Sequence, residues 1–193
     1  YASGNSYKYS TGISVATSGS TGKVRGLSIS PDKKTGIMTI ACALYKVEFG
    51  DDWLDKVHNS QTTDCGYYGA NSPLNYCGNS AFTPQLVAGH ETVCGDVDGT
   101  TGTSRFDFGY GQGTINGDSY WYGHTVFNAA GTGVYVADWQ NDKIRFLDLS
   151  TNTVTSDCTA CISTTKPLNL AITPDGSYLL VGRGVGTSTR ILS

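Results

Sequence analysis

Three histidines and one pair of aspartates are the side chains in this sequence that could hold a metal ion. His58, His90 and His124 lie in three different segments, without the close spacing of a zinc motif. Asp96 and Asp98 belong to the stretch Asp-Val-Asp-Gly, which resembles the start of a calcium loop but lacks the closing Glu. A turn rich in aspartate explains that stretch equally well. His90, His124, Asp96 and Asp98 are thus weak metal candidates, and we expect no cofactor, with calcium as the alternative.

Motifs for nucleophilic or nucleotide chemistry are missing from the sequence. It contains no G-x-S-x-G, no P-loop and no dinucleotide-binding fingerprint. Asp138 ends a run of β-forming residues, where a carboxylate can accept hydrogen bonds from turn amides, and we expect that structural role for it. The glycine-rich stretch 182–186 opens no helix and is expected to be a hairpin loop. The sequence assigns no catalytic residue, and we lean against an enzyme.

The cysteine count predicts disulfides. Six cysteines in a chain of low lysine content favour a secreted protein with up to three bridges, and the pairing stays open. For the C-x-x-C pair we favour bridges to other cysteines, or one local bridge, over a zinc site or a redox dithiol. The cysteines are Cys42, Cys65, Cys77, Cys94, Cys158 and Cys161.

Aromatic side chains gather in the irregular stretches. If exposed, they would suit stacking on sugars or contact with a protein partner, and if buried they would pack long loops. Both interpretations stay open. The chain has no N-x-S/T sequon, so a glycan on it would be O-linked, for example near residues 18–21 or 187–189. The residues concerned are Tyr67, Tyr68, Tyr76, Tyr110, Tyr120, Trp121 and Tyr122.

Composition narrows the class of protein. Charged residues make up 15% of the 193 residues and the net charge is −3, which argues against nucleic-acid binding. No apolar run is long enough for a membrane helix. The 25 glycines and 12 tyrosines, with frequent Ser and Thr, are typical of an all-β protein with many turns. We expect an extracellular, secreted all-β domain.

The elements that must position these residues follow a repeated pattern. Residues 122–149 predict a strand around Val126, a turn, a buried strand over 134–137, a second turn and an alternating strand over 143–149. The pattern recurs over 24–49 and, in part, over 168–193. Gly131 and Gly176 occupy matching turn positions, and so do Pro31 and Ala129. This period and strand content predict four-stranded, propeller-like blades.

The stretch 82–149 resembles an NHL-repeat propeller. The resemblance is fair over 166–193, where the related YVTN-type propellers are also similar, and weak over 23–50. The usual Pro-x-Gly before the first strand is replaced by Tyr122-Gly123-His124. The segments that carry the resemblance are Leu86-Val87-Ala88-Gly89, Asp98-Gly99, Thr103-Ser104-Arg105-Phe106, Val134-Tyr135-Val136-Ala137-Asp138 and Asn141-Asp142-Lys143-Ile144-Arg145.

The predicted division is one propeller-like domain, or part of one, with about three blades. The first blade spans 23–89 with an insertion at 51–81 pinned by Cys65 and Cys77, the second spans 90–158, and the third, 159–193, lacks its fourth strand. Residues 1–22 hold a lone strand that could complete a blade. Its assembly candidates are Tyr7, Tyr9, Ile13 and Val15.

The strand count suggests a function. Three blades are fewer than the roughly four to eight of known propellers, so the leading expectation is a non-catalytic structural or adhesive protein. It would self-associate by strand sharing, as a closed oligomer or a filament. Two alternatives stay open. The resemblance implies an enzyme, a metal-dependent lyase or a lactonase-like hydrolase. The chain could also be part of a receptor or matrix propeller that binds protein or glycan.

Overall fold

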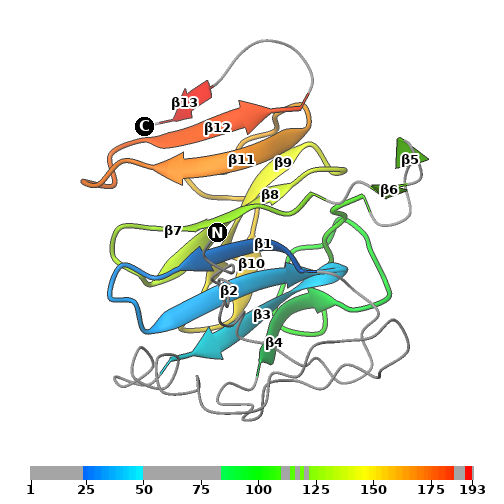
Figure 1. The fold of residues 1–193 in the computed structure, drawn as a ribbon, viewed down its shortest axis with the longest axis horizontal. Helices are drawn as coiled ribbons and strands as arrows, with labels where there is room; N and C mark the ends of the chain where they lie inside the picture. Colours follow the sequence, from blue (N-terminus) through cyan, green and yellow to red (C-terminus); the bar gives the residue numbers. More distant parts are fainter. Residues whose placement is uncertain are drawn as a thin grey trace, which may run out of the picture.

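The computed structural model describes residues 24–49, 84–109, 114–115, 118–119, 122–184 and 190–192. These residues form three antiparallel sheets, which we call blades 1, 2 and 3 in chain order, and one small hairpin (Figure 1). Every regular element in this part of the chain is a strand. The predicted all-β fold of propeller-like blades is therefore confirmed.

Blade 1 has the strand order β1-β2-β3-β4. Its strands are β1 (Val24–Ile29), β2 (Thr35–Ile40), β3 (Cys42–Glu48) and β4 (Gln85–His90). The apolar run of β2 is buried because both of its edges are paired and both of its faces are covered. Ala41, with a φ of 53°, makes the tight turn into β3.

Blade 2 is built from the stretch whose pattern was clearest in the sequence. It contains β7 (Thr125–Phe127), β8 (Gly133–Asp138), β9 (Lys143–Asp148) and β10 (Thr153–Thr155), in the spatial order β10-β9-β8-β7. β8 and β9 pair in unbroken register from Gly133↔Asp148 to Asp138↔Lys143. The predicted strands of this blade are confirmed.

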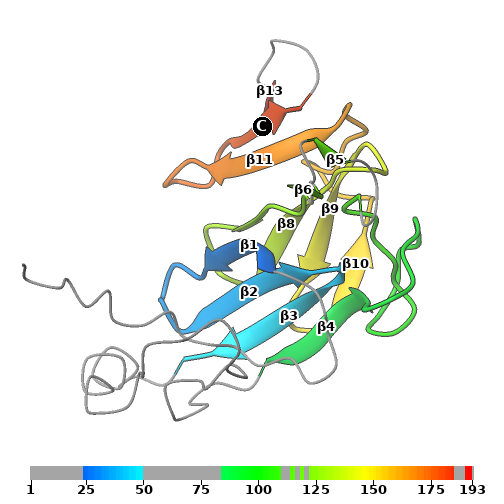
Figure 2. The ribbon, with the colours of Figure 1, turned by 45° about the vertical axis from the view of Figure 1, so that its right-hand side comes forward.

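Blade 3 contains three described strands, β11 (Pro167–Ile172), β12 (Leu179–Arg183) and β13 (Arg190–Leu192). They pair in chain order. Between blades 1 and 2 in the chain lies the hairpin of β5 (Thr114–Ile115) and β6 (Asp118–Ser119), which the sequence did not predict. Figure 2 shows the three blades as separate layers that follow one another.

The core lies between the blades. Strand alternation sends successive side chains to opposite faces, so blade 2 contributes to a layer on each of its sides. One layer joins blades 1 and 2 around Phe106 and Phe108, which are fully buried. Another joins blades 2 and 3 around Ile144, Leu170 and Val181. Blade-on-blade packing is thus the main source of apolar burial in the described part of the chain.

Several predictions concern residues outside the described part. They are the 7–17 strand with Tyr7, Tyr9, Ile13 and Val15, the 51–81 insertion with Cys65 and Cys77, His58, and all of the aromatic candidates except Tyr122. The exact division into blades also stays a prediction. In the described part, no helix has the length and apolar character needed to span a membrane.

Candidate functional site

The first strand of each blade forms the inner edge of its sheet. These strands, β1, β7 and β11, lie side by side (Figure 1). The hydroxyls of Ser28 and Thr125 are 2.8 Å apart and link blade 1 to blade 2. The backbone N–H of Leu170 donates to Nδ1 of His124 over 3.1 Å and links blade 3 to blade 2. The three blades therefore meet along their inner strands.

The turn after each inner strand follows one plan. In each, the backbone N–H at the third turn position donates to the carbonyl of the residue that closes the inner strand, over 2.8 to 3.0 Å. That third position has a positive φ in all three blades, namely 64° at Lys33, 71° at Gly131 and 74° at Gly176. The predicted equivalence of Gly131 and Gly176 is therefore visible in the backbone, and Lys33 extends it to blade 1.

The residue that closes each inner strand also orders its turn through its side chain. Ser30 Oγ accepts from the Thr35 N–H, Asn128 Oδ1 accepts from the Thr132 and Gly133 N–H groups, and Thr173 Oγ1 accepts from the Tyr178 N–H. These are local bonds from polar side chains to the backbone, which favour turns. They hold the three turns at one end of the inner strands.

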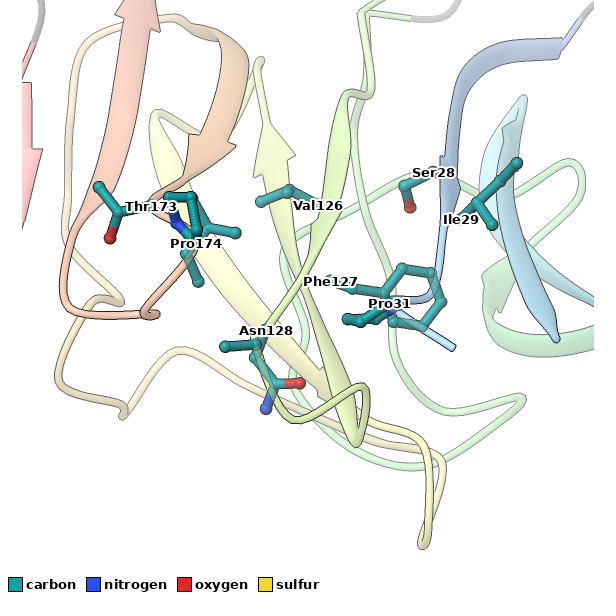
Figure 3. Close-up of a pocket in the computed structure, with 10 residues that line it drawn as sticks. Ser28, Ile29, Pro31, Val126, Phe127, Asn128, Thr173 and Pro174 are labelled. Atoms are coloured by element: carbon teal, nitrogen blue, oxygen red, sulfur yellow. The ribbon is translucent and has the colours of Figure 1, made fainter. Parts of the chain in front are cut away.

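A pocket of about 260 Å³ lies between these turns (Figure 3). Blade 1 stands on one side, blade 3 on the other, and the end of β7 lies between them. Ile29 is 46% exposed, so the pocket is open to solvent. The lining residues come from equivalent positions of the three blades and are Ser28, Ile29, Pro31, Val126, Phe127, Asn128, Ala129, Ile172, Thr173 and Pro174.

The polar side chains that line the pocket form hydrogen bonds to other residues of the chain. Ser28 bonds to Thr125, and Asn128 also donates from Nδ2 to Thr132 Oγ1 over 2.9 Å. Thr173 Oγ1 donates to Asp175 Oδ1 over 2.6 Å. The lining residues include no side chain that ionises. The pocket is consequently an apolar depression, without a general acid or base among its lining side chains.

Backbone groups supply the remaining polarity of the pocket. In an antiparallel pair, residues alternate between those bonded to the partner strand and those whose N–H and C=O point to the open side. Asn128 is bonded to the partner strand, and so is His124, whose carbonyl accepts from Ala137 N–H. Phe127 therefore points its N–H and C=O toward the open side. Ile29 and Ile172 stand at the same place in their blades.

His124 lies at the other end of β7, half-buried between blades 2 and 3. Burial lowers its pKa, so the imidazole is neutral near pH 7. Because Nδ1 accepts from Leu170, the proton of the neutral ring is on Nε2. His124 thus contributes one N–H donor close to the inner strands.

The four candidate metal ligands do not lie together in one site of the structure. Nδ1 of His90 accepts from the N–H groups of Thr92 and Val93, and Nδ1 of His124 is held by Leu170. Asp96 pairs with Lys143, while Asp98 pairs with Arg145 and Ser156. Among the described residues, no three His, Cys, Asp or Glu side chains gather in a metal-binding group.

Arg145 is the centre of a buried network that the sequence did not predict. Its side chain is fully buried, and Nη1 lies 3.1 Å from Oδ2 of the equally buried Asp138. It also donates to Asp98 and to the carbonyls of Val97 and Arg105, and lies over the ring of Phe106. This network fixes the irregular stretch 93–109 to blade 2.

Asp138 has the structural role expected from the sequence. Oδ1 accepts from the backbone N–H of Asp107 over 2.9 Å, and Oδ2 accepts from Asn141 over 2.9 Å. Burial raises the pKa of Asp138 to about 6, although these donors and Arg145 favour the carboxylate. Its position in the core, away from the pocket lining, excludes it from direct contact with a ligand there.

Two disulfides lie within the described residues. Cys42 and Cys94 join β3 to the stretch after β4, and their Cα atoms are 5.3 Å apart. Cys158 and Cys161 form a local bridge with Cα atoms 4.8 Å apart, which agrees with the second of the two pairings expected for the C-x-x-C. Two disulfides indicate an oxidising environment.

Tyr122 is the one aromatic candidate within the described residues. The centroid of the Tyr122 ring lies 4.6 Å from that of Trp139. Nζ of Lys166, which belongs to blade 3, lies 4.6 Å from the centroid of the Trp139 ring. The stack joins blades 2 and 3 and so packs the structure. Of the two roles left open for the aromatic residues, partner contact and packing, these contacts support packing for Tyr122.

The comparisons with known proteins give information about the fold alone. No protein-family model matches the chain, and no curated protein matches it significantly. A solved auxiliary nutrient binding protein from Bacteroides thetaiotaomicron matches 88% of the chain and 36% of its own length, with 15% identity and a TM-score of 0.49. A luciferin-regenerating enzyme matches with 10% identity and a TM-score of 0.44, over 82% of this chain and 36% of its own.

A proposed 6-phosphogluconolactonase from Bacteroides fragilis matches 88% of this chain and 50% of its own length, with 17% identity and a TM-score of 0.39. The chain thus spans between about a third and a half of these structures. At such identities the likeness concerns the fold alone. It does not identify an NHL type.

The comparisons contradict the leading functional expectation, a non-catalytic structural or adhesive protein that self-associates by strand sharing. The matched structures include a luciferin-regenerating enzyme and proposed 6-phosphogluconolactonases beside nutrient-binding proteins. The expectation depended on a lone strand over 7–17, which lies outside the described residues. We therefore set that expectation aside.

Proposed function

We propose that this chain forms part of an extracellular, NHL-type β-propeller that binds a small organic molecule in the pocket between Pro31, Ala129 and Pro174. One observation carries the proposal. The pocket is lined by equivalent positions of three consecutive blades, at the end of the inner strands where the blades meet. Concave, mostly apolar sites at such junctions are the usual place for small ligands.

Further observations support this assignment. The turns that frame the pocket are fixed by their own hydrogen bonds, so the walls are formed before a ligand arrives. The two disulfides support a secreted protein. The proposal of an NHL type depends on the sequence motifs. Two residues of these motifs, Asp138 and Arg145, form the buried ion pair that helps to hold blade 2 together.

The test is methyl-detected NMR with a fragment library. We expect a subset of fragments to shift the methyl signals of Val126, Ala129 and Ile172, which line the pocket. Ala129→Pro should abolish these shifts, because a proline ring fills the space and the equivalent turns already carry Pro31 and Pro174. Ala130→Ser, at the exposed next residue outside the lining, is the matched control. The absence of any fragment that shifts these methyls would overturn the proposal.

Catalysis is the second candidate function, and His124 favours it. Its neutral imidazole keeps one N–H donor on Nε2, which is suited to polarise a carbonyl oxygen of a lactone. Lactone hydrolysis by the purified chain that is lost in His124→Gln and kept in His90→Gln would support an enzyme. Metal analysis of the same samples would show whether zinc or calcium accompanies the activity. No hydrolysis in any sample would exclude this candidate for lactones.

A further inference from the structure

We infer that the pocket selects an uncharged, mostly apolar molecule of one or two rings, and that Ala129 determines the size it accepts. This inference rests on the proposed function, since it names the ligand class of the same site. It follows from the charge, the volume, the backbone and the pseudo-symmetry of the pocket.

The lining excludes charged ligands. None of its side chains ionises, and its hydroxyl and amide groups are engaged with Thr125, Thr132 and Asp175. An ion that enters would lose part of its hydration without gaining an opposite charge, which is costly. The charged residues of the neighbouring turns, Asp32, Lys33, Lys34 and Asp175, lie outside the lining and carry opposite formal charges that sum to zero. They therefore give the pocket no net preference for one sign.

The volume limits the size of the ligand. An apolar protein cavity of about 150 Å³ is sufficient for benzene. The present pocket, at about 260 Å³, has room within its walls for one further ring. Its side toward solvent is open, so substituents on the ligand can remain hydrated there.

Strand geometry also directs backbone polar groups to this side. By alternation, Ile29, Phe127 and Ile172 present N–H and C=O groups at the open edges of the inner strands. Such groups bond to neutral hydroxyl, amide or carbonyl functions and can fix the orientation of a ligand. The best ligand is therefore an apolar ring system with a neutral hydrogen-bonding group.

Ala129 creates much of the space. It stands where the other two turns carry Pro31 and Pro174, because all three follow the residue that closes an inner strand. Its methyl group replaces a proline ring at the middle of three equivalent positions. The three turns therefore differ at this position, and the pocket lies beside the turn that lacks the proline.

The experiment compares two probes that share one two-ring system and differ in charge, neutral 2-naphthol and anionic 2-naphthoate, at pH 7. Each is titrated into the 193-residue chain while the methyl signals of Val126, Ala129 and Ile172 are followed. We expect 2-naphthol to bind at least about tenfold more tightly, since only the anion loses charge hydration. Ala129→Pro should abolish the 2-naphthol shifts at Val126 and Ile172, and Ala130→Ser should retain them.

The outcomes separate this inference from the proposed function. If 2-naphthoate binds at the pocket as tightly as 2-naphthol or more tightly, the ligand class is wrong, although the pocket remains a binding site. If Ala129→Pro binds 2-naphthol like the unmodified chain, the role of Ala129 is wrong. If neither probe shifts the pocket methyls while other fragments do, the class is again wrong. If no compound shifts them, the proposed function fails as well.

Discussion

The guanidinium of Arg145 and the carboxylate of Asp138 form an ion pair of 3.1 Å in which both side chains are fully buried. They lie on adjacent strands, β9 and β8, and both reach the irregular stretch 93–109. A buried charge is tolerated when it is paired and its remaining hydrogen-bonding groups are satisfied. Arg145 meets this condition through Asp98 and the two carbonyls it contacts.

Removing Arg145 should therefore destabilise the protein strongly. We expect Arg145→Met to lower the free energy of unfolding by about 3–5 kcal/mol, because Asp138 and the carbonyls of Val97 and Arg105 lose their buried charged partner. Urea unfolding at pH 7 measures the change. The matched control is Lys143→Met, which breaks a partly exposed pair with Asp96 and should cost less than about 1 kcal/mol. Equal losses in the two variants would contradict the network.

The raised pKa of Asp138 predicts a pH dependence of stability. Its folded-state pKa of about 6 lies above the ordinary value of 3.8, so the folded protein holds this proton more tightly than the unfolded chain. The resulting stabilisation is complete below about pH 4, declines as the pH rises to 6, and is absent above it. The total change is about 3 kcal/mol.

Asp138→Asn removes this titration and serves as the comparison. The difference in unfolding free energy between the two proteins should change between pH 4 and 7, with the unmodified protein losing stability relative to the variant. The lowered pKa of Asp98 acts in the opposite direction but is common to both proteins, so it cancels. A difference that does not change with pH would show that Asp138 titrates normally.

The two disulfides should differ in their contribution to stability. The bridge between Cys42 and Cys94 closes a loop with a sequence separation of 52, whereas Cys158 and Cys161 are separated by 3. From loop entropy, replacing both cysteines by Ala should cost about 4 kcal/mol for the first pair and about 2 kcal/mol for the second. Urea unfolding of the two double variants without reductant gives the values. The reverse order would contradict a loop-entropy origin.

Gly176 should tolerate alanine poorly for two reasons. Its φ is 74°, and an added Cβ would lie 2.7 Å from the Cβ of Ala129 on blade 2. Gly102 has a φ of 85° but nothing within 4 Å of an added Cβ, which makes it the matched control. We expect Gly102→Ala to cost about 1 kcal/mol and Gly176→Ala about 1–2 kcal/mol more, measured as a shift of the unfolding midpoint. Similar shifts would show that the turn of blade 3 can move away from blade 2.

The sequence predicted the blades because the period of a strand and the residues of a turn can be recognised over a few consecutive positions. The alternation around Val126 and the glycine at position 131 are examples, and both have the predicted environment. Asp138 has the expected structural role, but its backbone donor is Asp107 in the distant irregular stretch, and the turn that follows β8 contributes the side chain of Asn141. The hairpin at β5 and β6 was missed because its two-residue strands are too short to show a period.

The site was harder to predict because it depends on residues that are distant in sequence and chemically ordinary. Pro31, Ala129 and Pro174 are typical turn residues, and only their meeting between three blades makes a pocket. The matching turn positions of Pro31 and Ala129 were the available signal. The histidines His90 and His124 are of a reactive residue type, yet a backbone N–H group donates to Nδ1 of each, from nearby Val93 for His90 and from Leu170 on blade 3 for His124.

The common plan of the three turns makes them interchangeable parts. Loop length, the sign of φ and the closing hydrogen bond agree at Lys33, Gly131 and Gly176, so a turn can be transplanted from one blade to another without disturbing strand register. Grafting the turn of blade 3 into blade 2 would close the pocket with native material. Equally, grafting the turn of blade 2 into blade 1 or blade 3 would replace Pro31 or Pro174 by alanine and enlarge the same pocket.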